Sequence, residues 1–302
     1  MSALDLFEEH RPTLFGIAYR MLGSAADAED IVQDAWLKWS TVDVDAIAQP
    51  RAYLCRIVTN LSINRSRSAA VRRESYVGPW LPEPLVTAPD ATGGIEQAEA
   101  ISLAMLVVLE TLSPMERAVF LLKEVFGFGY PEIAGMLERS EASVRQVGSR
   151  ARRHVQARRP RYDAPAEVRR KVTEEFMAAC LGGDLNRMMD LLAPDVTAWT
   201  DGGGKIRAAL RPLHGADKVA RWLLGVLSSN PHLASGVHEV LVNGRPGLLF
   251  APGARPDSVA CLEIAEDGTV SALRLVRNPD KLAHVRVPGP PDRGTGPTPS
   301  DT

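Results

Sequence analysis

Arginine residues gather in one segment near the middle of the chain and could bind the bases and phosphates of DNA. Residues 141–161 hold seven arginines and a single glutamate. A short turn, Glu138–Ser140, precedes this segment, and a basic helix after such a turn can enter the major groove of DNA. A solvated basic face on a structural helix is the alternative, and the turn favours DNA binding. The candidate DNA contacts are Ser143, Arg145, Gln146, Ser149, Arg150, Arg152, Arg153 and Arg158.

A second basic segment covers residues 51–73 and carries six arginines. A helical periodicity would place Arg56, Asn60 and Asn64 on one polar face, opposite an apolar face. Asparagine can read the edge of a base, and unpaired bases stack on flat side chains. Amide side chains are also common on exposed helices, so this polar stripe alone favours neither DNA binding nor a solvated surface.

The helix predicted over residues 25–39 has the opposite charge. Asp27, Glu29, Asp30 and Asp34 make it acidic, so it would repel DNA. Its polar face suits a protein partner that carries basic residues. From composition alone, an ordinary surface helix is the better interpretation.

Three consecutive glycines occur in the segment Thr200–Lys205, TDGGGK. A phosphate-binding loop would need a glycine five residues before the Gly-Lys pair and Ser or Thr after the lysine. This chain has Trp199 and Ile206 at those places, so the pattern is not met.

Glycines reach positive φ angles that tight connections between strands need. We therefore predict a tight turn between strands at residues 195–200 and 205–210. We also predict that the turn receives the stiff apolar segment 80–85, WLPEPL, because Trp80, Leu81 and Leu85 are costly to leave in water. A plain hairpin turn is the alternative.

The composition is that of a globular protein large enough for two or three domains. The chain has 302 residues, 45% of them hydrophobic, and a net charge of −2. Its three cysteines, Cys55, Cys180 and Cys261, have no metal-ligand spacing and fit a reducing cytosol. We find no leader pattern, no long apolar run and no cofactor motif. The expectation is a cytoplasmic protein without a membrane segment, metal or cofactor.

Capping signals and helix breakers divide the chain into five parts. Gly23 should end the first helix, Ser24 and Ser113 should cap later ones, and Pro50 suits the first turn of a third. After Pro165, two helices and then several short strands indicate an α+β domain with a curved antiparallel sheet. The expected parts are an all-α domain (1–73), an extended linker (74–96), a second all-α domain with a helix-turn-helix (97–160), an α+β domain (165–286) and a disordered tail (287–302).

Together, the acidic helix, the sequence PRAYLCRIVTNLSINRSR and residues 112–153 resemble regions 2 and 4 of extracytoplasmic-function sigma factors of the sigma-70 family. The resemblance covers residues 4–159. It implies that the acidic helix docks on the β′ clamp helices of core RNA polymerase, with a further contact to the β flap. It also implies that residues 51–73 read and open the −10 promoter element, while the helix from Glu141 reads the −35 element.

The resemblance assigns roles to particular residues. The implied polymerase contacts are Asp27, Asp30, Gln33, Asp34 and Trp36. The implied contacts to the −10 element are Arg51, Arg56, Asn60, Asn64, Arg65 and Arg67.

The remainder of the chain is similar to the SigJ-like sigma factors, which carry a SnoaL-like extension with the NTF2 fold. Three motifs carry this similarity: WLPEP, DGGGK and NPDKL. In that group the extension controls the sigma factor, which implies control within the chain and no need for a separate anti-sigma factor. The implied interdomain residues are Trp80, Leu81, Pro82, Glu83, Pro84, Asp201, Gly202, Gly203, Gly204, Lys205, Asn278, Pro279, Asp280 and Lys281.

Two other functions stay open at this stage. Folds of this kind include enzymes, and an acid or base could be supplied by Asp195, Asp201, His214, His232 or His238. No pair of them has a diagnostic spacing, so we expect no enzyme. The C-terminal domain could instead sense a small apolar ligand, in a helix-turn-helix regulator that acts independently of core polymerase.

Overall fold

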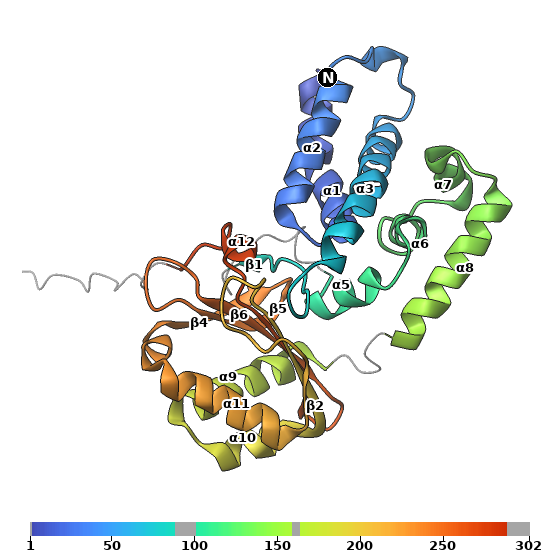
Figure 1. The fold of residues 1–302 in the computed structure, drawn as a ribbon. Helices are drawn as coiled ribbons and strands as arrows, with labels where there is room; N and C mark the ends of the chain where they lie inside the picture. Colours follow the sequence, from blue (N-terminus) through green and yellow to red (C-terminus); the bar gives the residue numbers. More distant parts are fainter. Residues whose placement is uncertain (1, 88–100, 159–163, 289–302) are drawn as a thin grey trace, which may run out of the picture.

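The computed structural model describes residues 2–87, 101–158 and 164–288. Figure 1 shows two helical regions, in blue and in green, next to a sheet that carries helices on its far face. This arrangement confirms the predicted fold class, two all-α domains followed by an α+β domain. In the described part of the chain, no helix is both long enough and apolar enough to cross a membrane.

The first helical region begins and ends its helices at the predicted signals. A capping box between Ser2 and Asp5 starts α1, and Gly23 ends it with φ +67°. Ser24 caps α2, and Pro50 lies in the first turn of α3. The elements are α1 (Ala3–Leu22), α2 (Ala25–Trp39), the 3-10 turn η1 (Val44–Ala46) and α3 (Pro50–Glu74).

The second helical region contains the predicted helix-turn-helix. Ser113 and Glu116 form the predicted capping box before α6. Glu138 has φ +53° and makes the turn between α7 and α8, and Ser140 accepts a hydrogen bond from the backbone of Ser143. The elements are α5 (Leu103–Glu110), α6 (Pro114–Phe120), the π-helical turn η2 (Leu121–Val125), α7 (Tyr130–Leu137) and α8 (Glu141–Arg158).

The C-terminal domain packs three helices on one seven-stranded sheet of order β1-β4-β5-β6-β7-β2-β3. Its helices and turns are α9 (Ala166–Gly182), α10 (Leu185–Leu191), α11 (Ala216–Ser229), η3 (Pro231–Gly236) and α12 (Pro279–Leu282). Its strands are β2 (Leu192–Asp201), β3 (Leu213–His214), β4 (Val237–Val242), β5 (Arg245–Phe250), β6 (Ser258–Ile264) and β7 (Val270–Val276). The edge strand β1 (Val86–Thr87) comes from the linker and pairs with β4.

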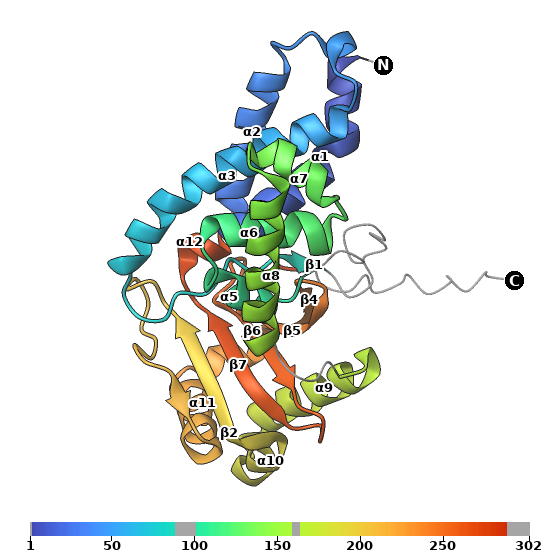
Figure 2. The ribbon, with the colours of Figure 1, turned by 90° about the vertical axis from the view of Figure 1, so that its right-hand side faces the viewer.

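The prediction of a purely antiparallel sheet was wrong. Strand β2 pairs in parallel with β7, whereas the other neighbouring strands are antiparallel. The pairing aligns Trp199 with Arg274 and Asp201 with Val276. The last residues of both strands therefore lie at the same end of the sheet, beside the helical regions (Figure 2).

The strand predicted at residues 205–210 does not form. Backbone N–H groups of Lys205 and Ile206 both donate to the carbonyl of Gly202, which makes a turn. The Thr200 hydroxyl then bonds the backbone of Ala209, at 2.8 Å to N and 3.0 Å to O. The Thr200 side chain thus makes the hydrogen bonds that backbone pairing between two strands would otherwise make. Backbone pairing on this side of β2 occurs at β3.

The two faces of the sheet have different partners. Helices α9, α10 and α11 cover one face (Figure 1), where Val196 and Leu248 are buried with Phe176. On the other face, Val240 belongs to the same buried cluster as Leu81 of the linker. That cluster continues into both helical regions, so burial of apolar surface joins all three parts of the molecule.

Candidate nucleic-acid and interdomain interface

The side chain of Asp201 lies at the centre of a polar network between the linker and the C-terminal domain. It is fully buried at the end of β2. One carboxylate oxygen accepts from the backbone N–H of Leu81 at 2.8 Å and from Lys281 Nζ at 2.7 Å. The other accepts from Tyr76 Oη at 2.5 Å and from the N–H of Gly203 at 3.1 Å. A single carboxylate therefore bonds two linker residues and two residues of its own domain.

Lys281 supplies the positive charge that this buried carboxylate needs. Its ammonium group also donates to the carbonyl of Leu81 at 2.5 Å and lies 4.2 Å from the ring centroid of Trp80. Burial lowers the pKa of Lys281 to about 8, and the Asp201 charge opposes that shift. Near neutral pH the lysine therefore stays largely charged and paired. Burial also raises the pKa of the Tyr76 hydroxyl, so that hydroxyl remains a donor to Asp201.

The three glycines leave room for neighbouring groups. A Cβ on Gly203, which has φ +60°, would lie 2.3 Å from Asn278 Nδ2, and a Cβ on Gly204 would lie 3.1 Å from Val77. Asn278 uses that space to donate to Tyr76 Oη at 2.8 Å while its own oxygen caps α12. The turn thus packs directly on the linker and on the segment that begins at Asn278.

A surface ion pair and the backbone hydrogen bonds of the glycine turn extend the contact between the linker and the C-terminal domain. Lys205 pairs with Asp280 at 2.6 Å on the surface. Pro279 lies in the first turn of α12, and Gly202 accepts the bonds that close the turn. The interdomain residues predicted from the motifs DGGGK and NPDKL thus lie within or directly beside one contact region, which also includes Leu81 of the linker.

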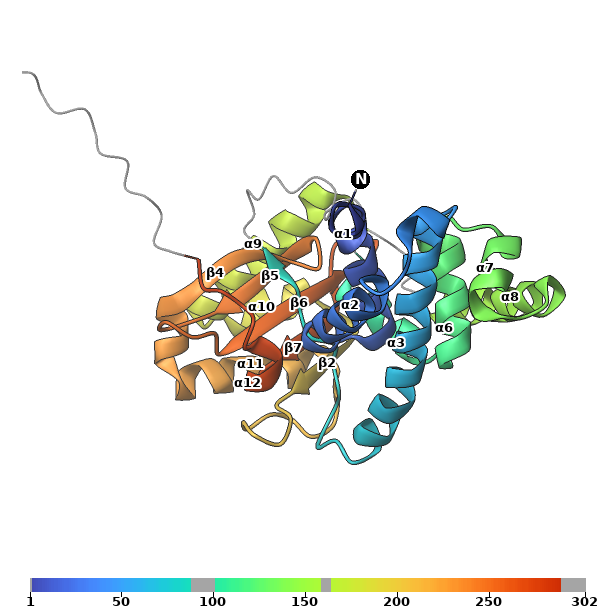
Figure 3. The same cartoon turned by 90° about the horizontal axis from the view of Figure 1, so that it is seen from above.

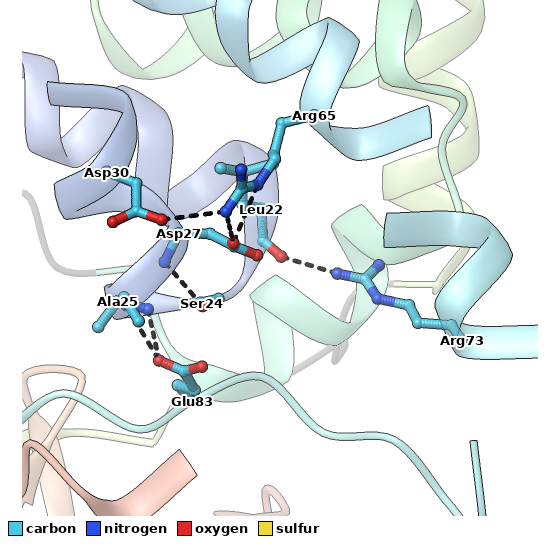
Figure 4. A network of polar contacts seen from close by, with 9 residues as sticks. Leu22, Ser24, Ala25, Asp27, Asp30, Arg65, Arg73 and Glu83 are labelled. Atoms are coloured by element: carbon cyan, nitrogen blue, oxygen red, sulfur yellow. Dashed lines mark hydrogen bonds and ion pairs between the residues drawn. The ribbon is translucent and has the colours of Figure 1, made fainter. Parts of the chain in front are cut away.

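Glu83 connects the linker to the N-terminus of α2 (Figure 4). Its carboxylate accepts from the N–H groups of Ala25 at 2.6 Å and Ala26 at 3.3 Å. Its backbone N–H donates to the carbonyl of Gly23 at 2.9 Å. Negative charge is favourable at a helix N-terminus. The flanking Pro82 and Pro84 restrict the backbone, so the linker reaches α2 in a stiff, extended form.

Trp80 packs where α1, α3 and the linker meet. The guanidinium of Arg73 lies 3.7 Å from the centroid of the Trp80 ring, donates to the carbonyl of Leu22 at 2.7 Å and pairs with Glu110 of α5. A Cβ on Gly23 would come within 2.8 Å of the Trp80 ring. The linker therefore contacts the first helical region and the C-terminal domain at once, and Arg73 of α3 joins this contact to α5.

Asn243 is a further interdomain residue that was not predicted from the sequence. It has φ +51° in the turn between β4 and β5, donates to Tyr19 Oη at 2.8 Å and accepts from the N–H of Leu85 at 3.2 Å. Tyr19 in turn donates to the carbonyl of Glu83 at 2.7 Å. The dipeptide Asn243-Gly244 is a hairpin-turn signal that could have marked the position. No local sequence pattern indicated the roles of Tyr19 and Tyr76.

One arginine of the basic helix α3 bonds two aspartates of the acidic helix α2. Arg65 pairs with Asp27 at 2.6 Å and with Asp30 at 3.0 Å (Figure 4). Gln33 and Asp34 are exposed, and Trp36 is half-buried with its ring 5.1 Å from that of Phe7, edge to face. One residue predicted to contact the −10 element is thus bound to two residues predicted to contact polymerase.

The second helical region covers part of the predicted promoter face of α3. Arg56 pairs with Glu138, Asn60 donates to the carbonyl of Met136 at 3.3 Å, and Arg51 lies 5.0 Å from the centroid of the Phe128 ring. Asn64 and Arg67, farther along α3, are exposed. The polar stripe of α3 therefore divides into a first half that contacts the second helical region and a second half that is exposed to solvent.

Helix α8 presents its predicted DNA contacts to solvent. Val144, Gly148, Ala151 and Val155 are buried against the rest of the region. Arg145 pairs with Glu141 and lies 4.8 Å from the centroid of the Tyr130 ring, which orients its guanidinium. All the predicted contacts are exposed, namely Ser143, Arg145, Gln146, Ser149, Arg150, Arg152, Arg153 and Arg158.

Comparison with known proteins identifies the family model that each of these three regions matches. Family models match Sigma-70 region 2 over residues 6–72, Sigma-70 region 4 over residues 102–155 and a SnoaL-like domain over residues 173–271. The chain is 42% identical over 288 residues to the ECF RNA polymerase sigma factor SigJ of Mycobacterium tuberculosis, with 91% of this chain and 92% of SigJ covered. This chain belongs to the ECF RNA polymerase sigma factors.

Further matches agree with that membership. The probable ECF RNA polymerase sigma factor SigI of M. tuberculosis is 30% identical over 281 residues, covering 92% of this sigma factor and 94% of SigI. The crystal structure of M. tuberculosis SigJ matches with a TM-score of 0.76 and 38% identity, covering 93% and 98% of the two chains. The family resemblance is therefore confirmed, and an independent helix-turn-helix regulator is not favoured.

Proposed function

We propose that this sigma factor binds core RNA polymerase through the exposed side of α2 and directs it to promoters through α3 and α8. The supporting observation is the separation of charge on the surface. Asp30 and Asp34 are exposed on α2, whereas α8 exposes a row of arginines and hides its apolar residues. Acidic and basic surfaces on different helices suit a protein partner and a nucleic acid, respectively. Binding to core polymerase without DNA is the experiment that tests this assignment.

The C-terminal domain, in this proposal, controls the sigma factor within the same chain. Its Asp201 and Lys281 hold the linker, and Glu83 of that linker caps α2. The domain thereby fixes the relation between the two regions that carry the DNA contacts. A separate anti-sigma factor is not needed for such control.

The observed arrangement corresponds to a closed state. Arg56 and Asn60 donate to Glu138 and Met136 of the helix-turn-helix, so these donor groups are not available to bases in this arrangement. Promoter binding would therefore require the two helical regions to separate. The contacts between them include a shared buried apolar cluster and a hydrogen bond from buried Arg117 to the carbonyl of Met21 at 2.7 Å. Separation therefore costs free energy, which binding to polymerase and promoter DNA would have to supply.

We assign the C-terminal domain a regulatory role and no catalysis. The carboxylate of Asp201 accepts a hydrogen bond from the linker, and Asp195, His214 and His232 are exposed. His214 bonds Thr197 at 3.1 Å across β2 and β3. Among the residues that the structure describes, no group of His, Cys, Asp and Glu is arranged to hold a metal ion. Binding of a small molecule by this domain stays a prediction.

Replacing Glu138 with glutamine should favour the open state. The change removes the charge that holds Arg56 and keeps the shape of the side chain. Because both partners are largely exposed, the pair contributes up to about 1 kcal/mol, or about fivefold in an equilibrium. We expect the affinity of the holoenzyme for promoter DNA to rise about two- to fivefold, measured by fluorescence anisotropy.

The matched control is Glu175→Gln. Glu175 of α9 pairs with Arg187 of α10 at 2.5 Å, and both residues lie in the C-terminal domain. This variant removes an equivalent charge without touching α3 or a predicted DNA contact. Equal effects of the two variants on promoter affinity would refute the closed-state interpretation.

A further inference from the structure

The loop that follows the three glycines forms a surface with the end of α3. Residues 203–212 leave β2 and pack on the linker just after α3: a Cβ on Gly78 would lie 3.7 Å from the Cα of Leu210, and one on Gly204 would lie 3.1 Å from Val77. Figures 2 and 3 show this loop, in yellow-orange, beside the C-terminal end of α3. The C-terminal domain thus contributes to the surface on which α3 ends.

The loop is basic and contains no acidic residue. Residues 202–214 include Lys205, Arg207 and Arg211 and neither Asp nor Glu. Lys205 is paired with Asp280, but Arg207 and Arg211 are exposed, and no residue in the described ranges forms an ion pair with either guanidinium. Leu210 between them is 65% exposed. Two unpaired guanidinium groups therefore flank an apolar side chain that is open to solvent.

Nearby arginines of the first helical region are already occupied. Arg65 is bound to Asp27 and Asp30, and Arg73 is bound to Glu110 and Leu22. Among the side chains that the structure describes at this end of α3, Arg207 and Arg211 of the loop are therefore free to bind a new anion, as is exposed Arg67. The C-terminal end of α3 also lies away from α7 and α8 (Figure 3), so the closed state leaves this surface open.

We propose that Arg207 and Arg211 bind backbone phosphates of promoter DNA next to the segment that α3 reads. Cations on a loop beside a DNA-binding helix can extend its electrostatic contact without reading sequence. The alternative ligand is an acidic surface of polymerase. The position of the two unpaired guanidinium groups beside exposed Arg67 of α3, itself a predicted DNA contact, favours the phosphate backbone. The proposal deepens the function proposed above and rests on it, because the DNA must be delivered by holoenzyme.

The experiment compares the holoenzyme with wild-type chain and with the Arg207→Ala/Arg211→Ala double variant on the same promoter duplex. Each lost phosphate contact should make the slope of log affinity against log salt shallower by about 0.9. We therefore expect the double variant to have a slope that is about 1 to 2 shallower than that of the wild type, and an affinity about 3- to 10-fold lower near 0.1 M salt. The Arg207→Lys/Arg211→Lys variant should keep most of the affinity, because phosphate binding needs charge.

The matched control is Arg170→Ala/Arg187→Ala, which removes two exposed arginines from α9 and α10 of the same domain. It should leave the salt slope unchanged. An unchanged slope in the Arg207/Arg211 double variant overturns the proposal while leaving sigma activity intact. Weaker binding to core polymerase in the absence of DNA also overturns it, in favour of a polymerase contact. If the wild-type holoenzyme fails to bind promoter DNA, the proposed function itself fails.

Discussion

Replacing Asp201 with alanine is expected to lower the free energy of unfolding by about 3–5 kcal/mol, because it leaves the Lys281 ammonium buried without its partner. The change also removes the acceptor for the N–H of Leu81 and the hydroxyl of Tyr76. Urea unfolding followed by tryptophan fluorescence measures the stability. Hydrogen exchange at the Leu81 amide reports whether the linker is released.

The matched control is Lys205→Ala in the neighbouring pair. Lys205 and Asp280 are more than half exposed, so the loss of their ion pair should cost less than about 1 kcal/mol. A second variant, Asp201→Asn with Lys281→Met, removes both charges and should recover part of the stability lost in Asp201→Ala. A loss in Asp201→Ala no larger than that in Lys205→Ala would contradict the central role of this carboxylate.

Replacing Arg145 with alanine should reduce transcription from a cognate promoter about 5- to 150-fold. A side chain near the start of a recognition helix that reads a base edge supplies about 1–3 kcal/mol of discrimination. The effect should be largest on the preferred −35 sequence and smaller on promoters altered there, because the variant loses sequence discrimination. Run-off transcription on a set of promoters with single changes in the −35 element measures both quantities.

Arg153→Ala is the comparison for that experiment. Arg153 is exposed on the same helix but farther from its N-terminus, where phosphate contacts are expected. This variant should weaken binding to all promoters alike and reduce the salt slope by about 1. The same loss of sequence discrimination in both variants would show that Arg145 does not read a base.

Local signals predicted the helices because helix ends depend on neighbouring residues. Ser113 with Glu116, Gly23 and Pro50 each act within about one turn of chain, and each is found in the predicted role. The sheet was less predictable. The parallel pairing of β2 with β7 joins strands about 70 residues apart in the sequence, and the bond between Thr200 and Ala209 replaced an expected strand.

The contact region between linker and C-terminal domain was only partly predictable, for a similar reason. The motifs indicated that residues 80–84 and 201–205 act together, and in the structure Leu81 bonds Asp201. The pairings of Tyr76 with Asn278 and of Tyr19 with Asn243 join residues far apart in the sequence, and their types are common in any core. The contacts of α3 with the second helical region were also not predicted, since nothing in Arg56 or Asn60 indicates Glu138 or Met136 as a partner.

The affinity of the purified full chain for core RNA polymerase, measured without DNA near 0.15 M salt, tests the account most directly. We expect a Kd of about 1 μM or lower, and a loss of at least about 10-fold in Trp36→Ala, since buried aromatic residues dominate such interfaces. Leu181→Ala, which shortens an exposed apolar side chain on α9, is the control and should leave the affinity unchanged. No measurable binding by the full chain or by the Glu138→Gln variant would contradict the account.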